Sequence, residues 1–290
     1  MEENNLFRPK VTYLAKEETI CPVCENSFYR ELMLSKGGRL QADAITDSLH
    51  RLYKPSKKFG EIYPLTYSVL TCPRCLFSVL PGDFSNMNIE NKDSINDKVN
   101  ERIDFVKKII GNSVDFLKYK TIESGAAGYA LAVDCYDYFS RKSIPVIKQA
   151  ICSIRTAYLF EELENKSPKQ YFDYIAELYY KKALFFYKRA IELEQHKEQI
   201  IGDFKAFGPD IDKNYGYDSV IYLIGILTYK YGRKENKELR KKDLEEARLF
   251  LGKLFGLGKA DYKKPKEILE KSKDFHKLIS DEIKEIDEQL

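Results

Sequence analysis

The sequence predicts an α+β protein that is mostly α-helical, with a small β module before a long helical domain. Three observations predict this architecture. Two Cys-x-x-Cys pairs occur early in the chain, strand-forming and turn-forming residues fill the segment between them, and apolar residues recur at three- and four-residue spacing from about residue 92. We expect an N-terminal arm over 1–17, a zinc-ribbon-like four-cysteine module over 18–90, and a tetratricopeptide-like helical domain over 91–290.

The N-terminal module is predicted from four cysteines, Cys21 and Cys24 in CPVC and Cys72 and Cys75 in CPRC. Two intervening residues let a tight turn direct both sulfurs at one ion, and proline after the first cysteine suits such a turn. Zinc prefers four tetrahedral ligands, and thiolates are common among them. The 47 residues between Cys24 and Cys72 can form a closed loop, because the entropic cost of closure grows only logarithmically with length. We therefore predict one structural Zn²⁺ ion bound by all four cysteines.

Other interpretations of the cysteines stay open at the level of sequence. The two pairs can be metal-free turns with buried thiols, or one pair can be a thioredoxin-like redox motif. His50 lies between the pairs and is able to replace one thiolate ligand. Cys135 and Cys152 fall in helical patterns, where free cysteine packs as a small apolar residue. Four thiolates leave no open ligand position, so we expect a structural and not a catalytic ion.

The segment between the pairs is expected to contain strands and turns. Residues 62–70 (IYPLTYSVL) are rich in β-branched and aromatic residues, and residues 77–83 (FSVLPGD) form a short strand that a Pro-Gly pair stops. Arg39, Asp43 and Asp47 also lie in this region. They are either a polar functional cluster or ordinary ion pairs and turn hydrogen bonds, and we favour the second interpretation.

The residues around the two pairs follow a recognisable order. An aromatic residue, an arginine, an aspartate and a tyrosine follow CPVC, and a Tyr-Pro-x-x-Tyr-x-Val stretch precedes CPRC. These residues are Phe28, Arg39, Asp47, Tyr53, Tyr63, Pro64, Tyr67 and Val69. The pattern resembles the bacterial domain-of-unknown-function family 2225, closely over residues 18–90 and loosely over the helical remainder. The resemblance implies a zinc-binding module and this architecture, and it assigns no reaction. Family members commonly carry glycine after each second cysteine, where this chain has Glu25 and Leu76, which predicts looser turns.

The rest of the chain is predicted to be helical. The first pattern includes Ile95, Val99, Ile103 and Val106. Glycine, proline and asparagine mark the breaks between the later helices, and no strand is expected after residue 90. The later helices are predicted over 122–141, 144–164, 169–197, 216–231, 237–256 and 264–289.

Small residues at regular spacing predict a helical repeat. The pattern small–large–small occurs at Ala150-Ile154-Ala157 and again at Ala183-Tyr187-Ala190, 33 positions later. This period is close to the 34 residues of a tetratricopeptide repeat. A partial copy lies at Ala247-Leu251-Leu254, with a possible partner at Ile221-Ile224-Gly225. We therefore predict tetratricopeptide-like packing, with an irregular helical bundle as the alternative.

Aromatic residues surround the helix predicted over 169–197. A helix that is apolar on all sides is enclosed by neighbouring helices or by a partner, and tyrosine is favoured at interfaces. Core packing is the favoured interpretation for most of these residues, and a protein-binding surface is the alternative. The candidate partner-binding residues are Tyr171, Tyr174, Tyr179, Tyr180 and Tyr187.

Composition and missing motifs bound the function. The 290 residues carry a formal net charge of +3, and residues 1–90 hold eleven basic and eleven acidic side chains, which disfavours a phosphate-binding surface. No Walker loop, G-x-G-x-x-G, H-E-x-x-H or G-x-S-x-G motif occurs. The polar N-terminus and the lack of a long apolar run predict a cytoplasmic protein. We expect a non-enzymatic protein–protein interaction or scaffold protein, with a zinc-ribbon nucleic-acid-associated protein as the alternative.

Overall fold

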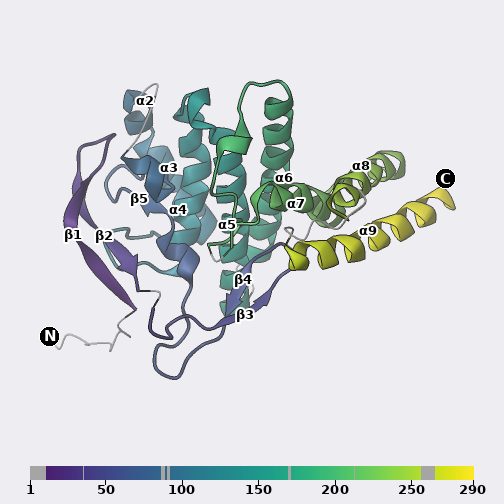
Figure 1. Cartoon of the computed structure of the whole chain (residues 1–290). Coiled ribbons are helices and arrows are strands. Elements are labelled where there is room, and N and C mark those ends of the chain that lie inside the picture. The colour runs from purple at the N-terminus through teal and green to yellow at the C-terminus, as the bar shows by residue number, and fades with distance from the viewer. Residues whose placement is uncertain are drawn as a thin grey trace. The chain divides into compact units, whose positions relative to one another are not determined.

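The chain divides into two compact units (Figure 1). The computed structural model describes residues 11–34, 36–85, 89, 92–168, 171–211, 213–255 and 265–290, so most of the predicted N-terminal arm lies outside the described residues. Unit 1 comprises Met1–Thr46 and Arg51–Tyr138, and unit 2 comprises Asp47–His50 and Phe139–Leu290. The division therefore falls near residue 138 and not at 90, because the first helices pack with the cysteine-rich segment.

Three antiparallel strand pairs lie within the described ranges of unit 1. The first pair is β1 (Thr12–Ile20) with β2 (Ser27–Met33), and the third is β5 (Leu70–Thr71) with β6 (Ser78–Val79). Each Cys-x-x-Cys motif occupies the turn of one of these hairpins, as the sequence predicts. The second pair is β3 (Ala42–Ile45) with β4 (Arg51–Tyr53).

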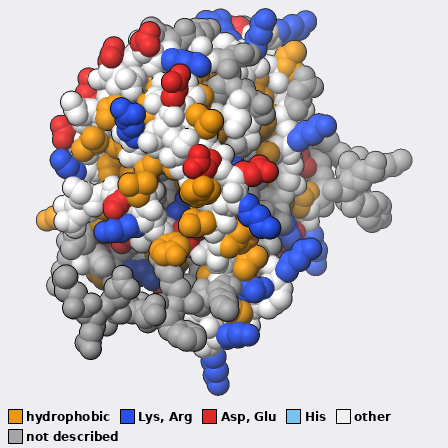
Figure 2. All heavy atoms as spheres, turned by 90° about the vertical axis from the view of Figure 1, so that its left-hand side faces the viewer, with side chains coloured by type: hydrophobic (Ala, Val, Ile, Leu, Met, Phe, Trp, Pro, Cys, Tyr) orange, Lys and Arg blue, Asp and Glu red, His pale blue; other side chains and the backbone are white. Residues whose placement is uncertain are grey.

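The β1–β2 hairpin exposes several large apolar side chains. Tyr13, Leu14, Ile20 and Tyr29 are each about half exposed or more. Figure 2 shows this side of the molecule, on which hydrophobic side chains lie among charged ones. The register of β1 against β2 shifts between Leu14 and Glu18, which places a bulge in the outer strand. Bulges of this kind hinder pairing of an exposed strand with another chain.

The predicted strand over 62–70 is wrong over most of its length. Residues Pro64–Tyr67 form a 3₁₀ helix, η1, and β5 begins only at Leu70. Pro64 fixes φ at the first helical position, and the Thr66 hydroxyl donates to the Tyr63 carbonyl at 2.8 Å. The Tyr129 hydroxyl donates to the Leu65 carbonyl at 3.0 Å. Tertiary hydrogen bonds thus outweigh the local preference for a strand.

Four α-helices lie in the part of unit 1 that the structure describes. Helix α4 packs closely against η1 and β5. A Cβ atom added to Gly125 would lie only 2.9 Å from the Thr66 backbone. A Cβ atom added to Gly128 would lie only 2.9 Å from Thr71 Oγ1. The Ser78 hydroxyl donates to the Gly128 carbonyl at 2.7 Å, which fixes β6 on the same helix. The second cysteine hairpin is therefore backed by α4. The helices are α1 (Pro81–Phe84), α2 (Lys92–Asp97), α3 (Val99–Ile110) and α4 (Ile122–Cys135).

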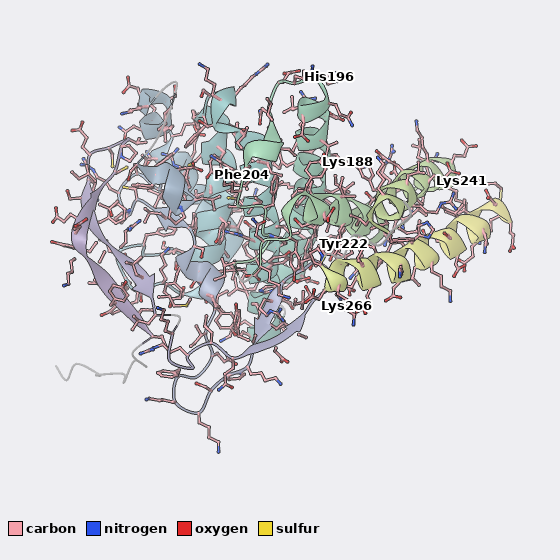
Figure 3. All side chains as sticks on the ribbon, in the orientation of Figure 1. Lys188, His196, Phe204, Tyr222, Lys241 and Lys266 are labelled. Carbon is pink, nitrogen blue, oxygen red and sulfur yellow. The ribbon has the colours of Figure 1, made fainter. Side chains whose placement is uncertain are left out.

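The described residues of unit 2 include five long helices, each of which packs on the next along the chain (Figure 3). The Lys188 ammonium of α6 also pairs with the Glu246 carboxylate of α8 at 2.7 Å. The predicted helical ranges agree with the observed ones to within a few residues at most ends. The helices are α5 (Pro145–Lys166), α6 (Phe172–Gln195), α7 (Gly216–Tyr231), α8 (Lys237–Phe255) and α9 (Lys266–Asp287).

Small residues lie where these helices approach each other. Ala150, Ala157, Ala183 and Ala190 are completely buried in the most extensively packed helix pair, α5 and α6. Between α7 and α8, a Cβ atom on Gly225 would lie 2.6 Å from the Leu251 side chain. The pattern small–large–small therefore marks real contacts, as ridge-into-groove packing requires. Assignment of these helices to tetratricopeptide-like repeats stays a prediction.

None of the helices in the described ranges is both long enough and apolar enough to cross a bilayer.

Candidate metal centre

The four predicted ligands come together in unit 1. The sulfurs of Cys21, Cys24, Cys72 and Cys75 all lie within 4.8 Å of one another, with 3.6 Å between Cys21 and Cys75 and 3.5 Å between Cys24 and Cys72. Zn–S bonds of about 2.3 Å in a tetrahedron place sulfurs roughly 3.8 Å apart. The donor set and its spacing thus fit one tetrahedral metal ion.

The two cysteine turns have the same backbone hydrogen bonds. The Cys21 amide donates to the Asn26 carbonyl at 2.9 Å, and the Glu25 amide donates to the Cys21 carbonyl at 3.0 Å. The second turn repeats this pattern with Cys72, Phe77 and Leu76, at 2.8 and 3.0 Å. Two separate segments of sequence therefore build one local structure twice, and each presents two sulfurs to the same point.

The residue after each second cysteine has a left-handed backbone. Glu25 has φ 60° and Leu76 has φ 56°, in the region where glycine is favoured over any residue with a side chain. This geometry explains why glycine suits these positions. The sequence predicts that one or both turns are looser or metal-free; both turns close with the same backbone hydrogen bonds despite the strained residues, and their metal content stays a prediction.

The strain at Glu25 leads to a first prediction. Its side chain is exposed, so Glu25→Gly removes the left-handed penalty without loss of buried surface. We expect the free energy of unfolding to rise by about 1 kcal/mol, measured by urea denaturation. Glu17→Gly is the matched control, because it places glycine in strand β1 and should destabilise. Equal destabilisation by both substitutions would contradict the assignment of strain to Glu25.

The electrostatics of the cluster favour a bound cation. Hydrogen bonds from the Cys72 and Cys75 thiols lower the pKa of Cys21 to about 2. The hydrogen bonds that Cys72 and Cys75 make with Cys21 raise the pKa of Cys72 to about 12 and also raise the pKa of Cys75. Four sulfurs so close together cannot all ionise unless positive charge is added, and a divalent metal supplies that charge.

An arginine of α3 binds the backbone of the second cysteine turn. Arg102 is 3% exposed, and its Nε and Nη2 atoms donate to the Cys75 carbonyl at 3.0 and 2.8 Å. Nη2 also donates to the Ile95 carbonyl. Sequence analysis did not single out Arg102. Its buried charge beside a thiolate cluster is the kind of outer contact that orients metal ligands.

The other candidate ligands lie outside the cluster. Among the described residues, the four cysteines are the group that could hold a metal. Cys135 and Cys152 are completely buried, and the Cys135 sulfur accepts a hydrogen bond from the Ser78 amide at 3.4 Å, as expected of core cysteines. His50 belongs to unit 2 and stacks on Tyr158.

Arg39, Asp43 and Asp47 do not form a functional cluster. The Arg39 guanidinium donates to the Lys36 carbonyl, and the Asp43 carboxylate lies 3.5 Å from the Lys54 ammonium. Asp47 is placed in unit 2, where two lysines contact its carboxylate. The favoured interpretation as ion pairs and turn hydrogen bonds is confirmed for these contacts.

The five candidate partner-binding tyrosines divide into two groups. Tyr171 and Tyr174 are 77% and 60% exposed. Tyr179, Tyr180 and Tyr187 are buried in unit 2, with at most 4% exposure. These three are core residues, because the inner side of α6 packs against the neighbouring helices, and they are not available to a partner.

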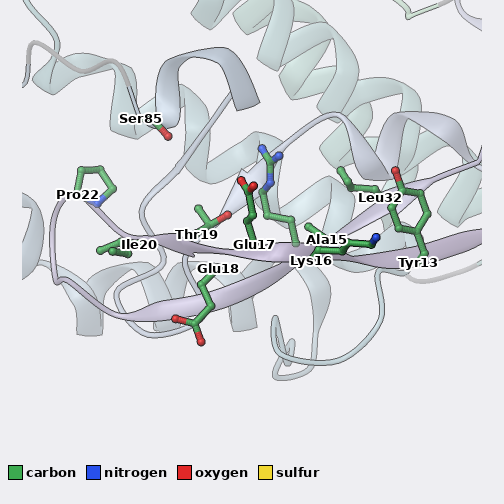
Figure 4. Close-up of a pocket in the computed structure, with 11 residues that line it drawn as sticks. Tyr13, Ala15, Lys16, Glu17, Glu18, Thr19, Ile20, Pro22, Leu32 and Ser85 are labelled. Atoms are coloured by element: carbon green, nitrogen blue, oxygen red, sulfur yellow. The ribbon is translucent and has the colours of Figure 1, made fainter.

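An open concavity of about 720 Å³ lies along the β1–β2 hairpin in unit 1. Its lining combines apolar residues such as Tyr13, Ile20 and Leu32 with the charged residues Lys16 and Glu17 (Figure 4). Glu17 and Glu18 extend to opposite sides of strand β1, as the alternation of a strand requires. The residues that line this concavity include no cysteine and no histidine.

The fold and the site define a class: a two-unit α+β protein with a four-cysteine candidate metal centre and a helical remainder. The chain belongs to the family described as "Uncharacterized protein conserved in bacteria (DUF2225)", which matches residues 14–279. A protein of Borreliella burgdorferi, described as "Uncharacterized protein", is 38% identical over 277 residues, which cover 96% of this chain and 99% of that relative. No solved structure matches the chain.

Proposed function

We propose that this protein is a non-enzymatic, cytoplasmic interaction protein, in which a structural zinc ion holds unit 1 together and unit 2 binds other proteins. The observation that carries the interaction role is an exposed apolar stripe on α6. The zinc assignment is supported by the donor set and by its geometry. The two parts of the proposal have separate tests.

Zinc is the metal that this donor set favours. Four thiolates at tetrahedral spacing suit Zn²⁺, and a reducing cytoplasm keeps cysteines available as ligands. Four protein ligands saturate the ion, which argues for a structural role. The buried positions of Cys21, Cys72 and Cys75 shield such an ion from solvent, while Cys24 is half-buried.

The α6 stripe consists of Tyr174, Leu178 and Phe185, which are 60%, 40% and 62% exposed, and Tyr171, just before the helix, is 77% exposed. The spacing of four and seven residues places the three stripe residues on one side of the helix. Exposed apolar side chains that gather on one face are typical of binding surfaces. The packing of consecutive helices in unit 2 supports the same interpretation, because helical-repeat proteins bind partners on such surfaces.

The stripe can be tested with a triple variant, Tyr174→Ser/Leu178→Ser/Phe185→Ser. Because these side chains are exposed, the melting temperature should change by only a few degrees. Capture of partner proteins from native cells, quantified by mass spectrometry, should fall at least tenfold, about 1.4 kcal/mol of binding free energy.

Leu278→Ser is the matched control, since Leu278 is 46% exposed on another helix, α9. It should leave capture unchanged. A large fall in melting temperature in the triple variant would assign the stripe to the fold. Salt-sensitive capture of nucleic acid in place of protein would favour the alternative function.

A further inference from the structure

Arg102 of α3 is a buried cation that contacts only neutral groups. It is 3% exposed, and its hydrogen bonds go to the Cys75 carbonyl and the Ile95 carbonyl. Its Nη1 atom is buried without a hydrogen-bond partner, and the guanidinium forms no ion pair with a carboxylate of the described residues. A buried charge in this state destabilises the fold, because no opposite charge compensates for the water that it has lost.

The position of Arg102 in its helix adds to this cost. Arg102 is the fourth residue of α3, which begins at Val99. The N-terminal end of a helix carries a partial positive charge, because its first amide groups point outward without partners. A cation is disfavoured there, so the local structure also calls for a nearby negative charge.

The other ionisable groups near Arg102 do not supply that charge. The guanidinium is close enough to Cys135 to lower its pKa, but burial has the larger effect and raises that pKa to about 12, so the thiol is neutral. The charges of Asp134 and Asp137 also act on Cys135. Both carboxylates are exposed, and solvent screens their effect on a buried cation.

The four-cysteine cluster lies beside the guanidinium. Because Arg102 binds the Cys75 carbonyl, covalent geometry puts its charge within roughly 8 Å of the Cys75 sulfur. Both groups are buried, so water screens their interaction little. A divalent ion with four thiolate ligands carries two net negative charges. A loaded metal centre therefore has the sign of charge that Arg102 lacks among its direct contacts.

We propose that Arg102 is the counter-charge of the metal centre, and that its guanidinium stabilises the doubly negative four-thiolate complex and so raises the affinity of unit 1 for zinc. This inference rests on the zinc site of the proposed function. It gives Arg102 a role beyond its hydrogen bonds to the second cysteine turn. The two roles make different demands, since a counter-charge must be positive, whereas the turn needs only a hydrogen-bond donor.

The test compares zinc affinity in the full-length wild type and in Arg102→Lys, Arg102→Gln and Arg102→Met. Zinc-loaded protein is titrated with a chelator of known zinc affinity, and the zinc that each protein retains is measured. The glutamine and methionine variants lack the charge, so their zinc affinity should fall at least about tenfold. The lysine variant keeps the charge and should stay within about threefold of the wild type.

Cobalt substitution adds a readout that a purely structural role would not change. Co²⁺ bound by thiolates absorbs light through charge transfer from sulfur to metal, and a nearby positive charge lowers the energy of the sulfur electrons. Loss of this charge in Arg102→Gln should move the absorption band to longer wavelength. Arg102→Lys should leave the band in place.

Lys108→Gln is the matched control, since it removes a positive charge from an exposed position on the same helix. Its zinc affinity should change by less than about twofold, because solvent screens that charge. Circular dichroism in excess zinc checks the fold, and Arg102→Met replaces Arg102→Gln if the glutamine variant does not fold.

Equal zinc affinities in Arg102→Lys and in the neutral variants would overturn the proposal, and would leave Arg102 as a hydrogen-bond donor to the turn. An unshifted cobalt band in Arg102→Gln would also contradict it. A wild type that binds no zinc would instead reject the zinc site of the proposed function. The two failures are thus distinguishable.

Discussion

Cys72→Ser is expected to unfold unit 1 and to leave most of the helical signal of unit 2. Cys72 is completely buried and is one of four sulfurs that surround a single point. Structural zinc contributes about 10–16 kcal/mol of apparent binding free energy in small modules, which equals or exceeds the stability of a typical domain. Limited proteolysis should cut within unit 1, far-UV circular dichroism should decrease only in part, and the zinc content should fall well below one ion per chain.

Cys135→Ala is the matched control for this experiment. Cys135 is equally buried in unit 1 but lies outside the cluster, so its loss should cost only about 1–2 kcal/mol and leave zinc content unchanged. Removal of zinc from the wild type with a strong chelator should reproduce the Cys72→Ser result. Freshly purified wild type with far less than one zinc per chain would contradict the zinc assignment.

Acidification is expected to destabilise unit 2 through His50. Burial lowers the pKa of His50 from 6.5 to about 3. Below pH 6.5 the unfolded chain therefore binds a proton that the folded chain excludes, so stability from this group is complete above pH 6.5 and is lost as the pH falls toward 3. The slope approaches about 1.4 kcal/mol per pH unit, or about 3 kcal/mol between pH 6.5 and 4. Urea denaturation at a series of pH values measures it.

His50→Gln should flatten this pH dependence, because glutamine does not titrate. The Asp210 carboxylate lies 3.7 Å from His50 Nε2, and burial still lowers the pKa of His50. His196→Gln is the control, since His196 lies at the exposed end of α6 (Figure 3) and should leave the slope unchanged. An unchanged slope in His50→Gln would assign the acid sensitivity to other groups.

The sequence predicts those features that local pattern determines. The cysteine turns follow from two short motifs, and most helices of unit 2 follow from apolar spacing and from Gly and Pro breaks. Small residues at Ala183 and Gly225 correctly mark close helix contacts. The meeting of the four cysteines at one point also follows, because two Cys-x-x-Cys pairs favour a shared site even across a long loop.

The remaining features depend on tertiary contacts that no local pattern carries. Residues 64–67 have strand-like composition, and hydrogen bonds from α4 favour a 3₁₀ turn instead. The helices α2 to α4 look like the start of the helical domain, but they pack with the cysteine hairpins. Burial of Tyr179 and Tyr180 depends on which side of α6 meets α5 and α7. The left-handed backbone of Glu25 and Leu76 was signalled by one sequence feature, the family's preference for glycine at these two positions.

The path of the chain between the units has an evolutionary consequence. The polypeptide passes from one unit to the other at 46–47, 50–51 and 138–139. Recombination at residue 139 would deliver five helices without Ser48, Leu49 and His50, and would expose the buried surface that these residues cover. We therefore expect the two units to be inherited together; the family match over residues 14–279 spans all three crossings.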